Sequence, residues 1–158
     1  MSDIKKRALD SFGHEILKLL QLDNKTSQRS IAEQIGLSTP AVQRRVAHME
    51  ASGVILANTS VVAPDAVGQN ITAIVESRLR DDRSQVMDRA KRYFAGVDEI
   101  QQCYFVNGGV SFIIVMIARD VGHFEKLVRM HFADNEDILT YRTLIVLDKV
   151  KVGLSIPV

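Results

Sequence analysis

A nine-residue run, Val110–Ala118, is apolar at every position except Ser111. Successive side chains of a β-strand point to opposite faces of the sheet, so a strand here presents apolar side chains on both faces. Both faces must therefore be covered, and this requirement constrains the fold more than any other feature of the sequence. One face would carry Val110, Phe112, Ile114 and Met116, and the other Ile113, Val115 and Ile117.

The segments around this run alternate between strand and helix patterns. Apolar periodicity and turn residues predict strands over 71–79, 99–106, 110–118 and 139–150 and helices over 84–94 and 121–132. The order βαββαβ is that of a ferredoxin-like α+β domain, an antiparallel sheet with both helices on one face. Because two helices cover only one face, we expect the same sheet of a second copy to cover the other, giving an obligate homodimer.

Three short helices are predicted in the first sixty residues. Apolar residues recur at helical spacing from Leu9 to Leu20, a second helix follows Ser27, and a third ends before Gly53. Gly36 suits the left-handed residue that ends a helix, and Ser38 or Thr39 can cap the next one. Two helices joined by such a short turn indicate a helix-turn-helix.

The third predicted helix has two different faces. Val42, Val46 and Met49 form a narrow apolar wedge that would face the other helices, and the opposite face is small and polar. Arg and Gln side chains can pair with base edges, and a capped helix N-terminus can bind a phosphate. A solvated face in a purely structural bundle is the alternative interpretation. The candidate DNA-binding residues are Ser38, Thr39, Pro40, Gln43, Arg44, Arg45 and His48.

Net charge and apolar runs narrow the class of protein. The formal net charge is only +1, so DNA contact would come from a local patch and not from the field of the whole chain. The longest uninterrupted apolar run is far shorter than the ~20 residues of a membrane span, and the N-terminal segment lacks the apolar stretch of a signal peptide. A single cysteine, Cys103, lies in an apolar setting and fits a reducing compartment. We expect a cytoplasmic protein without membrane contact.

A change of pattern marks the domain junction. Residues 54–57 and 60–63 read as extended segments, and Pro64, Asp65 and Gly68 then interrupt the pattern. The predicted organisation is a helix-turn-helix domain over 1–60, a linker over 61–69 and a second domain over 70–158.

The whole pattern resembles the Lrp/AsnC family of bacterial and archaeal transcription regulators. The resemblance implies a DNA-binding winged helix-turn-helix, a domain that binds a small-molecule effector such as an amino acid, and dimers that can assemble into rings. It covers about residues 9–158. The segments that carry it are Leu9-Asp10, Ile16-Leu17, Ile31-Ala32, Gly36-Leu37-Ser38, residues 42–46, Met49-Glu50, Gly53-Val54-Ile55, Pro64 to Gly68, Val106-Asn107-Gly108 and Leu154 to Val158.

The sequence departs from the family at two places. Gly13 stands where members usually have an Asp, and a glycine inside a helix costs about 1 kcal/mol relative to alanine, so the first helix would start late or bend. The expected effector loop, Asn107, Gly108, Gly109 and Ser111, lacks both acids of the usual Gly-Asp-x-Asp pattern. Two interpretations stay open: an effector without a free amino group, or a tight hairpin that binds no effector.

No pattern indicates catalysis, a metal or a cofactor. His14, His48, His123 and His131 lack the spacing of metal ligands, and the sequence contains no phosphate-binding glycine loop or nucleophile elbow. We therefore expect a non-enzymatic DNA-binding regulator. Two alternatives remain: an Lrp-like enzyme acting on a modified haem, and a dimeric effector-binding scaffold with a vestigial helix-turn-helix.

Overall fold

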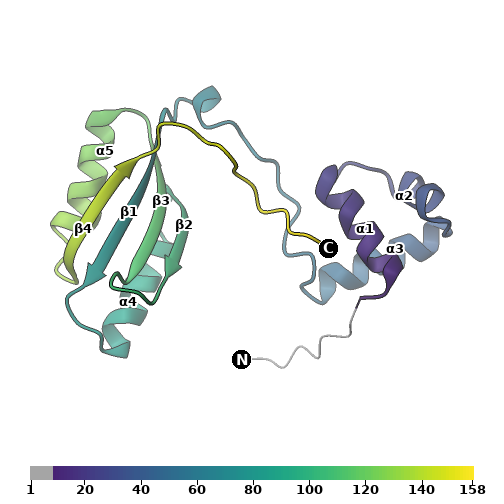
Figure 1. The fold of residues 1–158 in the computed structure, drawn as a ribbon, viewed down its shortest axis with the longest axis horizontal. Helices are drawn as coiled ribbons and strands as arrows, with labels where there is room; N and C mark the ends of the chain where they lie inside the picture. The colour runs from purple at the N-terminus through teal and green to yellow at the C-terminus, as the bar shows by residue number, and fades with distance from the viewer. Residues whose placement is uncertain (1–8) are drawn as a thin grey trace. The chain divides into compact units, whose positions relative to one another are not determined.

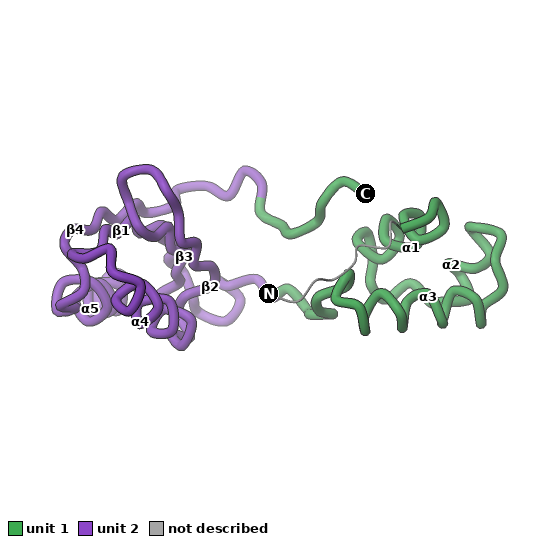
Figure 2. The backbone as a smooth tube through the Cα atoms, turned by 90° about the horizontal axis from the view of Figure 1, so that it is seen from below, with its two compact units in different colours: residues 1–61, 152–158 green, residues 62–151 purple. Residues whose placement is uncertain are grey.

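The computed structural model describes residues 9–158, which divide into two compact units. The first contains the described residues up to 61 together with 152–158, and the second contains 62–151 (Figure 2). The sequence predicted a first domain over residues 1–60 and a linker over 61–69. The last seven residues, however, were expected in the C-terminal domain and belong to the first unit.

Three helices build the first unit: α1 (Ser11–Leu22), α2 (Gln28–Ile35) and α3 (Thr39–Ala51). Asp10 caps α1 by accepting a hydrogen bond from the Gly13 amide, so the helix starts two residues after the apolar pattern does. Ser27 caps α2 in the same way through the Ser30 amide. The Ser27 bond places the start of α2 where the sequence predicted it.

The core of the first unit lies between these helices. The apolar wedge of α3 faces inward as predicted, with Val42, Val46 and Met49 buried against Ile16 and Ile31. The turn between α2 and α3 is short because Gly36 takes a left-handed conformation (φ 73°), and the Leu37 amide then donates to the Ala32 carbonyl. Leu37 packs on the same core.

The extended segments predicted after α3 do not form strands. Between Gly53 and Pro64 the structure contains no β-ladder. The amides of Val54 and Ile55 donate instead to the carbonyl of Met49, at 2.8 and 3.0 Å, and so close the C-terminal turn of α3. Leu56 and Val61, which follow, are almost fully exposed. A short 3₁₀ helix, η1 (Asp65–Val67), follows at the predicted interruption.

The second unit confirms the predicted βαββαβ order (Figure 1). All neighbouring strands of its four-stranded sheet are antiparallel, and their spatial order is β2-β3-β1-β4. Among residues 9–158, no helix is both long and apolar enough to cross a membrane. The elements are β1 (Ile71–Leu79), α4 (Ser84–Ala95), β2 (Ile100–Phe105), β3 (Phe112–Ala118), α5 (Val121–Val128), the π-helix η2 (Arg129–Ala133) and β4 (Ile138–Ile145).

One face of this sheet carries the core of the second unit. Phe112, Ile114 and Met116 of β3 are buried there, as the strand alternation predicted. Three phenylalanines meet at its centre: the Phe94 ring lies 5.2 Å from Phe112 edge to face and 5.6 Å from Phe132 in a stacked arrangement. Aromatic pairs at such distances add to the stabilisation that comes from burying their area.

The opposite face of the sheet is open in the single chain. Ile113, Val115 and Ile117 of β3 lie on it and are only partly covered. Tyr104 pairs with Ile113 across β2 and β3 and is 50% exposed, and Leu144, on β4 beside β1, is 42% exposed. Both helices lie on the other side (Figure 2). Among residues 9–158, this face lacks the helical cover of the other face, as the sequence predicted.

The helix predicted over 121–132 changes its hydrogen-bond pattern near its end. After α5 the chain widens into the π-helix η2, and His131 within this helix is buried. The Tyr93 hydroxyl lies 2.8 Å from His131 Nδ1. Burial lowers the pKa of His131, and nearby Glu99 opposes this effect. Protonation of His131 is therefore less favourable in the folded than in the unfolded chain.

We expect the free energy of unfolding to decrease as the pH falls from about 7.5 to about 5.5. The unfolded histidine keeps a pKa near 6.5 and takes up a proton first, so acid favours the unfolded state. Urea unfolding followed by circular dichroism at both pH values measures this change. The His131→Gln variant should lose less stability over the same range. An equal loss in both proteins would assign the effect to other groups.

Candidate nucleic-acid interface and effector loop

The outer face of α3 presents the predicted DNA-binding side chains to solvent. Six of the seven candidates are exposed and one, Arg45, is partly covered. Ser38 is the N-cap residue, but its side chain makes no capping hydrogen bond; its carbonyl accepts from the amides of Ala41 and Val42 instead. The Ser38 hydroxyl is thus not used by the helix. The exposed candidates are Ser38, Thr39, Pro40, Gln43, Arg44 and His48.

Arg45 differs from its neighbour because it joins α3 to the start of α1. Its Nη1 lies 2.8 Å from Asp10 Oδ1, the same oxygen that accepts from the Gly13 amide at 2.9 Å. The guanidinium also lies over the Phe12 ring, 5.7 Å from its centroid. The hydrogen bond from Arg45 is the main cause of a lowered pKa at Asp10. Arg45 is therefore engaged by α1.

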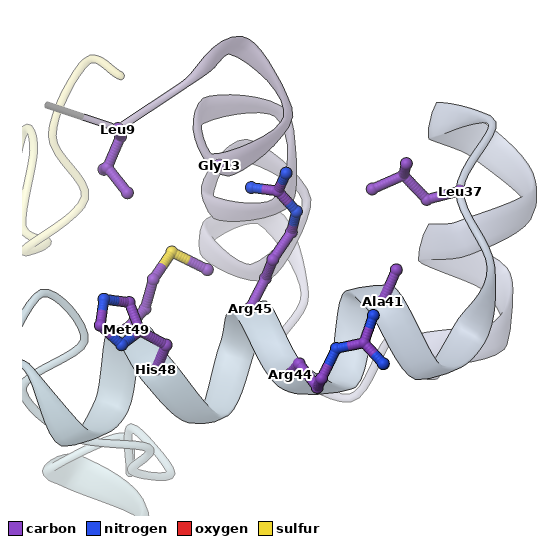
Figure 3. Close-up of a pocket in the computed structure, with 8 residues that line it drawn as sticks. All are labelled: Leu9, Gly13, Leu37, Ala41, Arg44, Arg45, His48 and Met49. Carbon is purple, nitrogen blue, oxygen red and sulfur yellow. The ribbon is translucent and has the colours of Figure 1, made fainter.

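A groove of about 410 Å³ runs between α1 and α3 beside these arginines (Figure 3). Leu9, Gly13 and Leu37 contribute to its walls. In Figure 3 Arg45 reaches toward α1, whereas Arg44 lies along α3. Of the ion pairs formed within residues 9–158, none includes Arg44. The two adjacent arginines thus stand in different electrostatic settings.

Periodicity placed Phe12 in the apolar pattern of the first helix, but it did not predict that Asp10 and Phe12 hold Arg45. Asp10 carried one usable signal, since an Asp just before an apolar helical pattern is a typical N-cap. Its pairing with Arg45, 35 positions later, depends on how α3 crosses α1, and no local pattern reports that crossing.

The predicted effector loop joins β2 to β3. Asn107, Gly108 and Gly109 are exposed at its tip. Both glycines have positive φ, 146° and 94°, and a Cβ added at either would meet no other atom within 4 Å. The main chain at the tip is thus open to solvent, in a conformation that favours glycine.

Ser111 lies at the base of this loop and is buried. Its hydroxyl oxygen accepts a hydrogen bond from the Leu79 amide at 3.0 Å, and its own amide donates to the Ser77 carbonyl at 2.8 Å. These bonds tie the loop to the end of β1. The hydroxyl of Ser111 can still donate one hydrogen bond, but its oxygen already has a structural partner.

The four histidines do not gather at one place. His131 contacts Tyr93, His123 lies 3.9 Å from Glu99, and His14 Nδ1 lies 2.9 Å from the Asp10 carbonyl oxygen. No group of three or more His, Cys, Asp or Glu side chains that could hold a metal ion occurs in the described part of the chain.

The first unit is a helix-turn-helix with an exposed basic helix, and the second is an α+β unit with an open loop. This combination defines a class of two-domain DNA-binding proteins. Family comparisons agree with both halves. Residues 9–55 match the winged helix-turn-helix DNA-binding family, and residues 72–156 match the Lrp/AsnC ligand binding domain. The chain belongs to the Lrp/AsnC family and is a DNA-binding transcriptional regulator with an effector-binding domain.

Individual relatives extend over nearly the whole chain. An HTH-type transcriptional regulator of Sinorhizobium fredii is 34% identical over 150 residues, which are 95% of this chain and 89% of the relative. The leucine-responsive regulatory protein of Escherichia coli K12 is 27% identical over 154 residues, 96% and 94% of the two chains.

Solved structures share the fold at lower identity. A Neisseria meningitidis transcriptional regulator in complex with L-Met has a TM-score of 0.88 at 19% identity, covering 95% of this chain and 97% of the other. The AsnC protein of E. coli has a TM-score of 0.84 at 22% identity, with 94% and 98% coverage. The expected fold class is thereby confirmed.

Proposed function

We propose that the outer face of α3 contacts the operator. The observation that carries this proposal is the contrast between the two arginines: Arg45 is paired with Asp10, whereas Arg44 stays exposed without an ion pair among the described residues. Arg44 and Gln43 have the donors to read base edges in a major groove. Arg45 contributes by holding α3 at a fixed position on α1, and His48 extends the same face.

The N-terminus of α3 suits a phosphate of the DNA backbone. Ser38 and Thr39 offer hydroxyl groups there. Pro40 has no amide hydrogen, so it leaves no donor without a partner in the first turn of the helix. The partial positive charge of a helix N-terminus favours an anion at this point. Such contacts fix the register of the protein on DNA, while the side chains farther along α3 specify the sequence.

Footprinting on the DNA immediately upstream of the protein's own coding region tests this function. Regulators that control themselves or a neighbour bind there, so we expect a protected segment at a stated salt concentration. Because association is dominated by phosphate contacts, affinity should fall steeply with salt at any sequence, and only the footprint reports specific recognition. No protection there or at other upstream regions would contradict operator binding.

We further propose that the protein is a homodimer that pairs through the open sheet faces and can assemble into larger rings. The apolar side chains of β3 on that face, Ile113, Val115 and Ile117, support the proposal. A two-fold dimer presents two copies of α3, so its operator should be an imperfect palindrome with half-sites one helical turn or a multiple apart.

We propose a cytoplasmic location for the protein, because it must reach chromosomal DNA.

The effector-binding residues are proposed to lie on the loop of Asn107, Gly108 and Gly109, with Ser111 at its base. The open main chain of the two glycines supports contact with a small molecule such as an amino acid or a derivative. Ser111 acts mainly through its bond to the Leu79 amide, which holds the loop on β1. Without an acid at position 109 or 111, the loop offers only neutral groups to an α-ammonium group, and a charged hydrogen bond is roughly twice as strong as a neutral one.

A Gly109→Asp substitution is expected to strengthen binding of an α-amino acid by about tenfold, through a charge-assisted hydrogen bond to its ammonium group. Gly109→Asn is the matched control, because asparagine has the same shape, tolerates positive φ and carries no charge. Isothermal titration of both variants and the natural chain against the protein amino acids measures the difference. An equal gain in the Asn variant would contradict the charge argument. Tight binding of an ordinary amino acid by the natural chain would contradict the altered-effector interpretation.

We propose that the protein is a regulator without catalytic activity. An Lrp-like enzyme acting on a modified haem would bind a tetrapyrrole with a change in visible absorbance and would not shift DNA. Absorbance titration with haem, run beside the footprinting, therefore separates the two. A scaffold with a vestigial helix-turn-helix would show neither response.

A further inference from the structure

The last residues of the chain return to the first unit at the C-terminal end of α1. Gln21 makes two hydrogen bonds to the main chain of Ile156: its Oε1 accepts from the Ile156 amide at 2.8 Å, and its Nε2 donates to the Ile156 carbonyl at 3.0 Å. A side-chain amide that both donates and accepts mimics the pairing between neighbouring strands. The two residues are 135 positions apart.

Two further features hold this segment in place. Val158 packs against the buried cluster that contains Ile16, Val42 and Met49, the core on which α3 rests. Pro157 restricts the residue before it to an extended conformation, so Ile156 is prearranged to present its amide and carbonyl to Gln21. The segment therefore loses less conformational entropy when it docks.

The docking uses the main chain and the terminal residue. The side chains of Leu154 and Ile156 stay 83% and 65% exposed, so their burial cannot account for the attachment. Recognition of an extended peptide through its main chain is a known mode of peptide binding. Gln21 is thus the residue whose substitution should release the segment.

We propose that this surface at the end of α1 is a docking site for the C-terminal segment of the same chain. The docked segment gives the DNA-binding unit a second link to the rest of the chain. The chain leaves the first unit at residue 61 and re-enters it at residue 152. Only residues 146–151 separate the end of β4 from this segment, so the chain runs from the ligand-binding domain to the docked end over a short distance in sequence. At its other end α1 holds Arg45 of α3 through Asp10. The docking itself does not depend on DNA binding.

Cross-linking of the full-length protein tests the proposal. Cys103→Ser removes the natural thiol, and Lys18→Cys with Ser155→Cys places thiols beside the docking contact, because residues 18 and 21 share a face of α1. A short bismaleimide should join the two within one chain, seen as a faster-migrating band at the mass of a single chain. Adding Gln21→Leu should lower the cross-linking rate about tenfold, since both hydrogen bonds are lost.

Hydrogen exchange at the Ile156 amide gives a second readout in the natural sequence. We expect protection that Gln21→Leu abolishes and that Gln21→Glu lowers only in part, because a carboxylate accepts from the Ile156 amide but cannot donate to its carbonyl. A cross-linked product with the mass of two chains would assign the site to the tail of a second copy and overturn the proposal. An unchanged rate in the Gln21→Leu variant, or an unprotected Ile156 amide, would overturn it as well.

Discussion

Replacement of Arg44 with alanine is expected to lower affinity for the operator by about 10- to 100-fold, while the unfolding midpoint of the protein stays unchanged. A bidentate contact from arginine to a base is worth about 1–3 kcal/mol, and Arg44 is the exposed arginine of α3 without an ion pair among the described residues. Loss of the Arg44 side chain should therefore lower the affinity for DNA and leave the stability of the fold unchanged. Fluorescence anisotropy with a labelled operator fragment, at one stated salt concentration, measures the change.

Two other arginines serve as controls for this prediction. Arg29 of α2 is highly exposed and pairs with Glu33 on the same helix, so Arg29→Ala removes the same charge from the same unit away from α3. It should lower affinity far less than Arg44→Ala does. Arg45→Ala should lower the unfolding midpoint as well, because Asp10 and Phe12 lose their partner. Equal losses of affinity in the Arg29 and Arg44 variants would show that the effect is one of general charge.

Replacement of Val115 with aspartate is expected to convert the proposed dimer into single chains at micromolar concentration. Val115 lies on the open face of β3, and a two-fold interface would place both copies of the new carboxylate against apolar side chains. Burial of an unpaired charge costs several kcal/mol, so the dissociation constant should rise more than 100-fold. Sedimentation equilibrium of the natural and variant proteins reports the mass directly.

Val121→Asp is the matched control for the dimer prediction. Val121 is exposed in the first turn of α5, where an aspartate is favourable, and it lies outside the sheet. This variant should keep the mass of the natural protein. If the Val115 variant stays dimeric while its circular dichroism is unchanged, the sheet faces do not form the interface.

Much of the fold followed from local rules that the sequence expresses directly. The alternation of β3 separated Phe112 and Ile114 from Val115, and the structure buries the first two against the helices while Val115 stays on the open face. Left-handed Gly36 and the cap Ser27 set the boundaries of α2 where the pattern predicted them. These features depend on neighbours a few positions away, so sequence reasoning can find them.

Other features depended on partners that no local rule identifies. The segment after α3 has a strand-like composition, but its first amides close the turn of α3 and no second strand lies beside it. The C-terminal residues read as part of the second domain because they follow β4. Gln21 and the core near Val158 hold them in the first unit instead. Composition indicates what a segment can form, and the available partner decides what it does form.

The sequence by itself determined the order of elements, the two faces of β3 and the chemical character of α3, because periodicity and capping are properties of short stretches. Tertiary structure decided the roles of individual residues within that frame. Arg44 and Arg45 are alike in sequence, yet only Arg45 lies opposite Asp10. Ser111 looks like a ligand contact, yet its oxygen bonds the Leu79 amide. In each case the role depends on a group more than thirty positions away, which reaches the side chain only through packing of distant elements.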